Sequence, residues 1–343
     1  MPVLAAYVGL QSISGLVFKG PKDYQVYSYP YVYSPEAFSA NFSSSDFYSA
    51  VFETFCKQSG VKFSECEVVI TGFLEPHILD FEVNYTSIDK ALEAMKEYNA
   101  VLVNNYAIVT PLGFKSFLPL EKGSVCGKTF ELEERNFYAN MALYPQIFPT
   151  DMASQIDLDS NISKLICNTS IEYIKDKPIM FMGSRFSGRK YHEELSYLLM
   201  VSLVRDPGVY ELKFDPTNEH VLSTLLKARN VTKASMEYHP TAVGTLISTT
   251  GPLECMVTTD IGTSQVIELQ VNKLFIVPLS EGEKAKIVLK TLGMDTIEKE
   301  IFGGTLGIIF DTRERKEDLI GETRVFNDSL KIVSAVLTGQ AQK

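Results

Sequence analysis

The side chains that most often carry catalysis or bind metals are isolated along this chain. Its histidines have no partner at zinc-binding spacing, and His192, which precedes Glu193 and Glu194, lacks the second histidine of an H-E-x-x-H motif. Ser12, Ser14 and Ser187 stand in no G-x-S-x-G nucleophile elbow. The sequence therefore predicts no catalytic residue and no metal site.

The cysteines are equally scattered, with no C-x-x-C pair and no histidine partner. There are five of them: Cys56, Cys66, Cys126, Cys167 and Cys255. This spacing favours reduced, buried thiols of a cytosolic protein over a zinc site or a disulfide framework.

Composition limits the class of protein and of partner. With 45% apolar and 22% charged residues, the chain is typical of a globular protein, and 343 residues are enough for two or three modules. The net charge of −10 and the lack of a long Lys/Arg cluster argue against electrostatic binding of nucleic acid or anionic lipid. The apolar start of the chain has no basic residues and is interrupted by Gly, Gln and Ser, so we expect strands there, no membrane insertion and a cytoplasmic protein.

The first third of the chain alternates between strand and helix patterns. Apolar runs at 3–9 and 13–18 predict a hairpin, and further strands are expected at 24–32, 68–72 and, as a pair, 100–110. Helices are expected from Ser43–Asp46 to Gly60 and from Lys90 to Tyr98. This β-β-β-α-β-α-β order resembles one lobe of the actin, sugar kinase and Hsp70 superfamily.

The middle of the chain repeats this theme. Strands are expected at 177–182 and 209–214, and helices at 163–174, 191–204 and 219–228. Asn230 and His239-Pro240 then interrupt the periodicity. We therefore expect a second lobe that ends near residue 230.

The stretch from Gln265 to Arg313 alternates apolar and polar residues and is broken by glycine turns, which predicts an antiparallel β module. It resembles the C-terminal module of the glutamate mutase accessory protein (GlmL/MutL) family, whose members are actin-like ATPases that service a cobalamin-dependent mutase. The matching residues are Pro278-Leu279, Gly282 to Ala285, Gly303-Gly304, Gly307, Asp311 and Arg313. The glycines are expected to allow bulges or close strand approach, although they could also form a docking surface.

The resemblance implies a nucleotide cleft between two lobes, with phosphate-binding hairpin turns. At the first turn, the family's aspartate is replaced by Tyr7, while Gly9 and Ser12 match the turn. Asn104 stands at the second turn, and Gly183-Ser184 stands where a Gly-Gly turn would lie under the adenosine. Because both loop aspartates are missing, the site would lack the charge that a Mg-nucleotide requires.

A literal match to a phosphate loop occurs at Thr259-Asp260-Ile261-Gly262-Thr263-Ser264. It lies too near the end of the chain to open a lobe, since mainly strand patterns follow it. We therefore expect a β-turn here.

The predicted fold is α/β: a reduced actin-like (ASKHA, ribonuclease H-like) two-lobe fold with a C-terminal antiparallel β module. The predicted division is a first lobe at 1–110, a second lobe at 111–230, the β module at 231–325 and a tail helix at 326–343.

Two functions fit this prediction. In the first, a degenerate actin-like protein acts as a scaffold or assembly subunit through contacts with itself or a protein partner, without ATP hydrolysis. In the second, a nucleotide-dependent chaperone-like ATPase services a cobalamin-dependent mutase, as the GlmL resemblance implies. The cofactor of the second would be Mg-ATP, and the first would bind it weakly or not at all.

Overall fold

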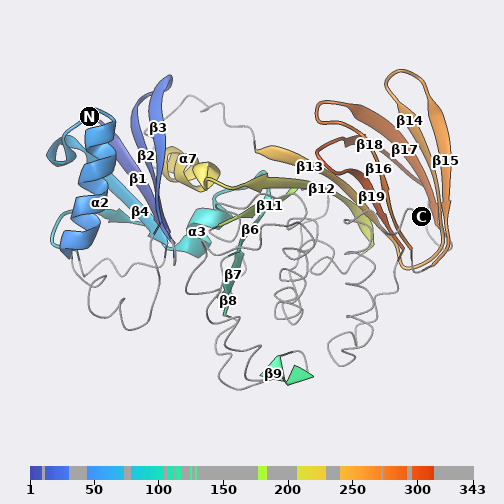
Figure 1. Cartoon of the computed structure of the whole chain (residues 1–343), viewed down its shortest axis with the longest axis horizontal. Coiled ribbons are helices and arrows are strands. Elements are labelled where there is room, and N and C mark those ends of the chain that lie inside the picture. The colour runs from blue at the N-terminus through green and yellow to red at the C-terminus, as the bar shows by residue number, and fades with distance from the viewer. Residues whose placement is uncertain are drawn as a thin grey trace.

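The computed structural model is a mixed α/β protein whose described strands form four sheets (Figure 1). It describes residues 1–9, 12–30, 45–72, 79–103, 107–110, 113–116, 124–125, 128–129, 177–183, 207–228, 240–271, 273–291 and 296–312. The helices expected at 163–174, 191–204 and 326–343 lie outside these residues. In the part of the chain that the structure describes, no helix is long and apolar enough to cross a membrane.

The first sheet contains the first five strands of the chain: β1 (Val3–Val8), β2 (Ser12–Gly20), β3 (Asp23–Pro30), β4 (Glu67–Gly72) and β5 (Asn84–Tyr85). Its order is β3-β2-β1-β4-β5, with antiparallel pairing of β3, β2 and β1 and parallel pairing of β1, β4 and β5. Every residue of β1 is buried, as expected for a central strand covered on both faces. The predicted hairpin and the strand at 68–72 are confirmed.

Helix α2 (Ser45–Gln58) covers one face of this sheet. Its buried side chains, among them Tyr48, Phe52 and Phe55, recur at helical spacing. They pack on the residues of β1, β2 and β4 that point to this face of the sheet. A short 3-10 turn, η1 (Phe63–Glu65), leads from the helix into β4. The helix predicted to end at Gly60 is confirmed.

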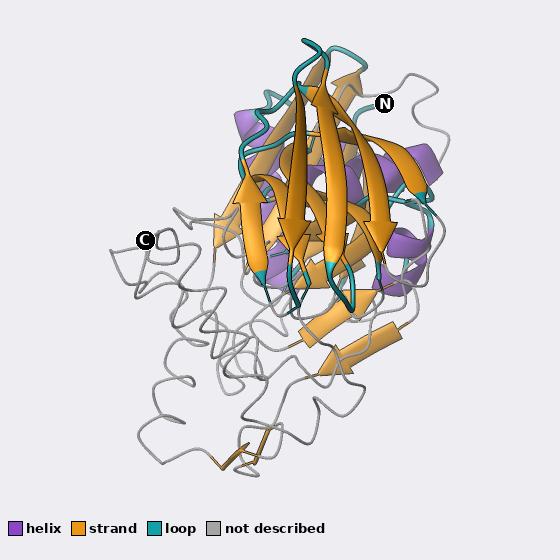
Figure 2. Cartoon of the chain, turned by 90° about the vertical axis from the view of Figure 1, so that its right-hand side faces the viewer, coloured by secondary structure: helices purple, strands orange, loops and turns teal. Residues whose placement is uncertain are grey.

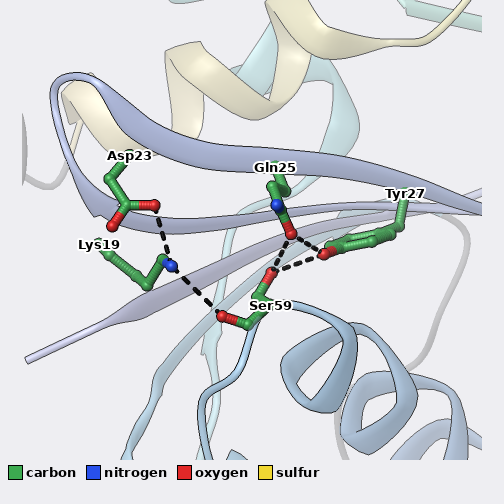
Figure 3. Close-up of polar contacts among 5 residues, drawn as sticks. All are labelled: Lys19, Asp23, Gln25, Tyr27 and Ser59. Atoms are coloured by element: carbon green, nitrogen blue, oxygen red, sulfur yellow. Dashed lines mark hydrogen bonds and ion pairs between the residues drawn. The ribbon is translucent and has the colours of Figure 1, made fainter.

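Polar contacts join the end of α2 to the β2–β3 hairpin (Figure 3). Lys19 Nζ donates to the Ser59 carbonyl at 3.3 Å and pairs with the Asp23 carboxylate at 2.9 Å. The Tyr27 hydroxyl contacts the Gln25 side chain and lies 2.8 Å from Ser59 Oγ. These contacts hold the hairpin beside the end of the helix.

The second sheet has eight strands: β6 (Asn99–Val103), β7 (Ala107–Thr110), β8 (Gly113–Ser116), β11 (Ile179–Met182), β12 (Gly208–Asp215), β13 (Thr241–Ser248), β16 (Leu274–Val277) and β19 (Gly307–Asp311). Its order is β16-β19-β13-β12-β11-β6-β7-β8. Within it, β8, β7 and β6 pair antiparallel, and β6, β11 and β12 pair parallel. Five consecutive strands of the second sheet therefore repeat the order and directions of the whole first sheet.

Two helices lie between these sheets, α3 (Ile88–Glu93) after β5 and α7 (Glu219–Ala228) after β12 (Figure 1). Helix α7 contacts β1, β2 and β4 of the first sheet, while α3 contacts β6 and β7 of the second sheet as well as β4 of the first. One buried cluster joins Tyr7 and Leu16 to Met180 and Leu222 across the helices. Each helix thus packs on the sheet of the other repeat.

The third large sheet is antiparallel throughout and consists of β15 (Ser264–Leu269), β14 (Leu253–Thr259), β17 (Lys284–Thr291) and β18 (Ile297–Phe302), in that order. Its inner side chains, such as Leu253 and Ile287, pack against Ile247 of β13 and Phe310 of β19. Its outer face is turned toward the viewer in Figure 2. The remaining ladder is the short pair β9 (Ser124–Val125) and β10 (Lys128–Thr129).

The strand pairing differs from the predicted division in two places. Residues 99–110, expected in the first lobe, form β6 and β7 of the second sheet. Three strands from the predicted 231–325 module, β13, β16 and β19, extend the second sheet instead of the antiparallel one. The sequence pattern of a strand does not specify which strand pairs with it. The pairing of β6 with β11, which lies far along the chain, could therefore not be predicted.

The second predicted helix is shorter than expected: it was expected to reach Tyr98 and ends at Glu93.

The C-terminal glycines allow close backbone approach, as predicted. A Cβ atom on Gly304 would lie 2.4 Å from the Val243 carbonyl carbon, and one on Gly307 would lie 2.3 Å from the Val277 oxygen. Gly303, Gly304 and Gly307 are all buried. Their place is therefore inside the fold, between β13, β16 and the end of β18.

Substitution at Gly304 tests this close approach. We expect Gly304→Ala to lower the free energy of unfolding by about 2 kcal/mol, because the added methyl group meets backbone atoms that cannot rotate away. The nearby hydrogen bonds Thr305 N to Ala242 O and Leu306 N to Val243 O would also be displaced. Urea unfolding measures the change. Gly251→Ala is the control, since nothing lies within 4 Å of a Cβ there, and equal stability of the two variants would contradict the prediction.

Candidate functional site

The candidate site lies at the carboxyl ends of β1 and β4, where the predicted phosphate turn was placed. Gly9 N donates to Ser12 O at 2.9 Å, so these two predicted site residues face each other across the tight β1–β2 turn. A Cβ on Gly9 would lie 3.1 Å from Tyr7 Cε1 and 3.3 Å from the Tyr7 hydroxyl. The ring of Tyr7 therefore lies directly against the turn.

The other predicted site residues belong to the second sheet or its connections. Gly183 follows β11 with a φ of +113°, and Gly72 ends β4 with a φ of +123°, so equivalent strands of the two repeats end at a glycine with a similar positive φ. At Gly72, a Cβ would lie 2.1 Å from the Val8 oxygen of β1. Asn104 and Ser184 lie outside the described residues.

Tyr7 is the central member of a buried polar row. It pairs laterally with Ser14 on β2 and with Thr71 on β4, so the three side chains share the sheet face that looks toward α7. Tyr7 and Thr71 are fully buried, and Ser14 is 2% exposed. The hydroxyls of Tyr7 and Thr71 have no hydrogen-bond partner among the described residues. Buried polar atoms of this kind are usually satisfied by ordered water or a bound group.

The start of α7 completes the row. Asn218, in the left-handed region with a φ of 59°, donates from Nδ2 to Ser14 Oγ at 3.1 Å. Its Oδ1 atom is buried and accepts no hydrogen bond within the described part of the chain. Asn218 thereby links the second repeat to the candidate turn of the first.

Asp215, at the end of β12, is the buried carboxylate closest in sequence to this row. Its hydrogen bonds go to the start of α7 and not to the row. One of its oxygens accepts from the Thr217 backbone N and hydroxyl at 3.1 and 2.9 Å, and the other accepts from His220 N at 2.8 Å. These bonds satisfy backbone donors at the start of α7, as an N-terminal cap does. Asp215 is therefore committed to structure.

The site is electrically neutral at the β1–β2 turn. Burial raises the pKa of the Tyr7 phenol, so the side chain stays protonated at any physiological pH. Beside the helix start, burial and the nearby Asp215 raise the pKa of Glu219. Within the described residues, no cluster of three His, Cys, Asp or Glu side chains could hold a metal ion. The row can bind water or a small neutral polar group, but it offers no carboxylate for Mg²⁺.

The literal phosphate-loop match forms a β-turn, as predicted. It connects β14 to β15, with Thr259 N donating to Thr263 O at 3.0 Å and Gly262 N donating to Thr259 O at 2.8 Å. Gly262 has a φ of +82°, which this turn requires. The sequence left open a docking surface that includes Asp311. Asp311 is fully buried, so its side chain is not available to a partner.

Sequence reasoning missed Thr71 and Asn218 as members of the polar row, and Asp215 as the cap of α7. Asp-Pro-Thr-Asn before an apolar helical run is a recognisable helix start, so Asp215 could have been identified as a cap. The contact of Asn218 with Ser14 spans two sheets and left no sequence signal.

Comparison with known proteins gives only distant structural likenesses. No protein-family model and no curated protein matches the chain. Component A of (R)-2-hydroxyglutaryl-CoA dehydratase from Acidaminococcus fermentans matches with a TM-score of 0.36 at 11% identity, over 67% of this chain and 100% of that one. The ethanolamine utilization protein EutJ from Carboxydothermus hydrogenoformans matches with a TM-score of 0.33 at 11% identity, over 66% and 88%. A PPX-GPPA enzyme from Aquifex aeolicus matches with a TM-score of 0.25 at 9% identity, over 56% and 71%.

Since every TM-score is below 0.5, none of these structures assigns a function to this chain. None of the three is a glutamate mutase accessory protein, so that resemblance stays a prediction.

The buried His220 predicts how stability depends on pH. Burial lowers the pKa of its imidazole, an effect that Asp215 partly opposes, and its ring lies 4.9 Å from the ring of Tyr98. In the unfolded chain the pKa of a histidine is about 6.5, which is higher than that of the buried His220 in the folded state. As pH falls, the unfolded state therefore takes up a proton before the folded state does. Stability is therefore lost as pH falls below that value, by up to about 1.4 kcal/mol per pH unit from this group.

Urea unfolding of the wild type and His220→Gln at pH 7.5 and 5.5 measures this contribution. We expect the loss of unfolding free energy between the two pH values to be smaller in the variant, because glutamine does not titrate. An equal loss in both proteins would contradict the assignment to His220.

Proposed function

We propose that this chain is a degenerate actin-like protein that acts as a scaffold or assembly subunit through protein contacts, without hydrolysing ATP. The repeated strand order of the two sheets supports a two-lobe actin-like architecture. The helix contacts support it as well, because α7 packs on the first sheet and α3 lies between β4 of the first sheet and β6 and β7 of the second. The four-stranded antiparallel sheet would be the C-terminal β module.

The observation that carries the loss of hydrolysis is Tyr7. An actin-like ATPase uses an aspartate at this turn to hold Mg²⁺ and its waters, a role that requires negative charge. The residue that we assign to this position is Tyr7, a fully buried phenol whose ring lies against Gly9. A neutral phenol cannot supply the negative charge that this role requires.

The outer face of the antiparallel sheet is the proposed contact surface. Val266 and Met256 are 56% and 41% exposed, lie opposite each other on β15 and β14, and continue to the half-buried Val288 on β17. This apolar row is flanked by ion pairs, Lys286 with Glu298 at 2.9 Å and Lys290 with Glu254 at 3.0 Å. An apolar centre with a charged rim is the usual composition of a protein interface.

The alternative is a nucleotide-dependent ATPase of the GlmL kind that services a cobalamin enzyme. It is favoured by the Gly9–Ser12 turn in the first repeat and the Gly183 turn in the second, which follow strands next to one shared core. Such a protein would bind Mg-ATP in spite of Tyr7 and would use nucleotide to move its lobes.

Titration with nucleotide separates these functions. We expect no heat of binding at millimolar Mg-ATP or Mg-ADP and no phosphate release above a buffer control, because the site lacks its carboxylate. Calorimetry is run beside a phosphate-release assay on the same preparation. Micromolar binding with turnover would contradict the proposal and favour the ATPase.

The contact surface is tested by charge substitution without nucleotide. We expect the wild type to self-associate with rising concentration in light scattering, and the double variant Met256→Lys/Val266→Lys to require on the order of tenfold higher concentration or more, because two charges would be buried in the interface. Phe275→Lys, an exposed apolar residue on β16, is the matched control and should assemble as the wild type does. Unchanged assembly of the double variant would exclude this face.

A further inference from the structure

Two cysteines that are separated in sequence meet where α2 turns into β4. Cys56 Sγ lies 3.6 Å from Cys66 Sγ, within the distance of a thiol hydrogen bond. Cys66 Sγ also lies 3.5 Å from the Lys62 carbonyl, to which its proton can be donated. When the Cys66 proton is donated to the Lys62 carbonyl, the Cys56 thiol can donate its own proton to the Cys66 sulfur. The two sulfur atoms then face each other.

The two thiols differ in accessibility. Cys56 is fully buried among the aromatic residues of α2, whereas Cys66 is partly exposed at the start of β4. A small reagent can therefore reach Cys66 first, while Cys56 is held behind it. This is the arrangement of an attacking thiol with a resolving thiol.

We propose that Cys56 and Cys66 form a reversible disulfide when the protein meets a low-molecular-weight disulfide oxidant. The sulfur atoms would have to approach by about 1.5 Å to reach the bonded distance of about 2.05 Å. Only the nine residues Lys57–Glu65 separate the two cysteines, and η1 lies among them. The bond would tie the end of α2 to the start of β4.

The chemistry balances with glutathione disulfide as oxidant. The Cys66 thiolate attacks one sulfur of the reagent, which forms a mixed disulfide and releases one glutathione thiolate. The Cys56 thiolate then attacks the Cys66 sulfur and releases the second glutathione. Two electrons pass from the cysteines to the reagent, and the two thiol protons end on the two released glutathione molecules.

Burial sets the rate of this exchange. It raises the pKa of Cys56 to about 12, and it also raises the pKa of Cys66, although the hydrogen bond with Cys56 lowers the latter in part. The thiolate is the reacting form, so oxidation should be slow near pH 7 and faster as pH rises.

The experiment treats the full chain with glutathione disulfide at pH 8.5, blocks remaining thiols with an alkylating reagent under denaturing conditions, and maps peptides by mass spectrometry. We expect a Cys56–Cys66 linked peptide that dithiothreitol reverses. We also expect a rise in melting temperature on the order of 5 °C, because the cross-link restricts the unfolded chain.

Variants distinguish the two thiols. Cys56→Ser should retain glutathione on Cys66, because the resolving thiol is missing, and Cys66→Ser should react far more slowly at Cys56. Cys255→Ser is the matched control, since Cys255 is equally buried on β14 with a pKa raised to about 12, and it should behave as the wild type does at the pair. A wild-type protein in which both thiols stay alkylatable, or in which only the Cys66 adduct accumulates, would overturn the proposal.

Discussion

The structure depends on one shared apolar core in which α3 and α7 are buried between two sheets. Neither helix is long, so neither would be stable by itself, and each depends on packing for its stability. Seven consecutive residues of α7, His220 to Leu226, are buried, which is possible only because material covers the helix on several sides. The two repeats are thereby joined through their interiors, and one cannot lose its helix without exposing the core of the other.

This shared core also explains the character of the candidate site. A solvent-exposed position would tolerate a charged aspartate, but Tyr7, Thr71 and Asn218 at the end of β1 and the start of α7 are all buried. A carboxylate there would need a compensating cation or several donors, and the described neighbours are neutral. The neutral phenol of Tyr7 therefore suits this buried position better than a carboxylate would.

The antiparallel sheet has a different relation to the rest of the molecule. Its inner face is fastened to β13 and β19 through apolar side chains, and the buried glycines near residue 304 bring backbones into direct contact there. Its outer face carries cross-strand ion pairs and an apolar row. Exposed cross-strand ion pairs add little stability, so they do not explain why apolar residues remain on this face, whereas a protein partner would.

The sequence by itself determined the local elements. Apolar runs, caps and glycine turns were sufficient to predict β1, β2, α2, β4, β11, β12 and α7, as well as the turn at Thr259–Ser264, because these depend on periodicity and turn chemistry within a few residues. The tyrosine at position 7, two residues before Gly9, was equally visible, since it is a matter of residue type.

Only the tertiary structure decided which strands became neighbours and which side chains met. The pairing of β6 with β11, the addition of β13, β16 and β19 to the second sheet, the contact of Asn218 with Ser14 and the approach of Cys56 to Cys66 all join residues from different elements. Such contacts depend on how whole elements pack, and a strand pattern specifies a buried face without specifying its partner.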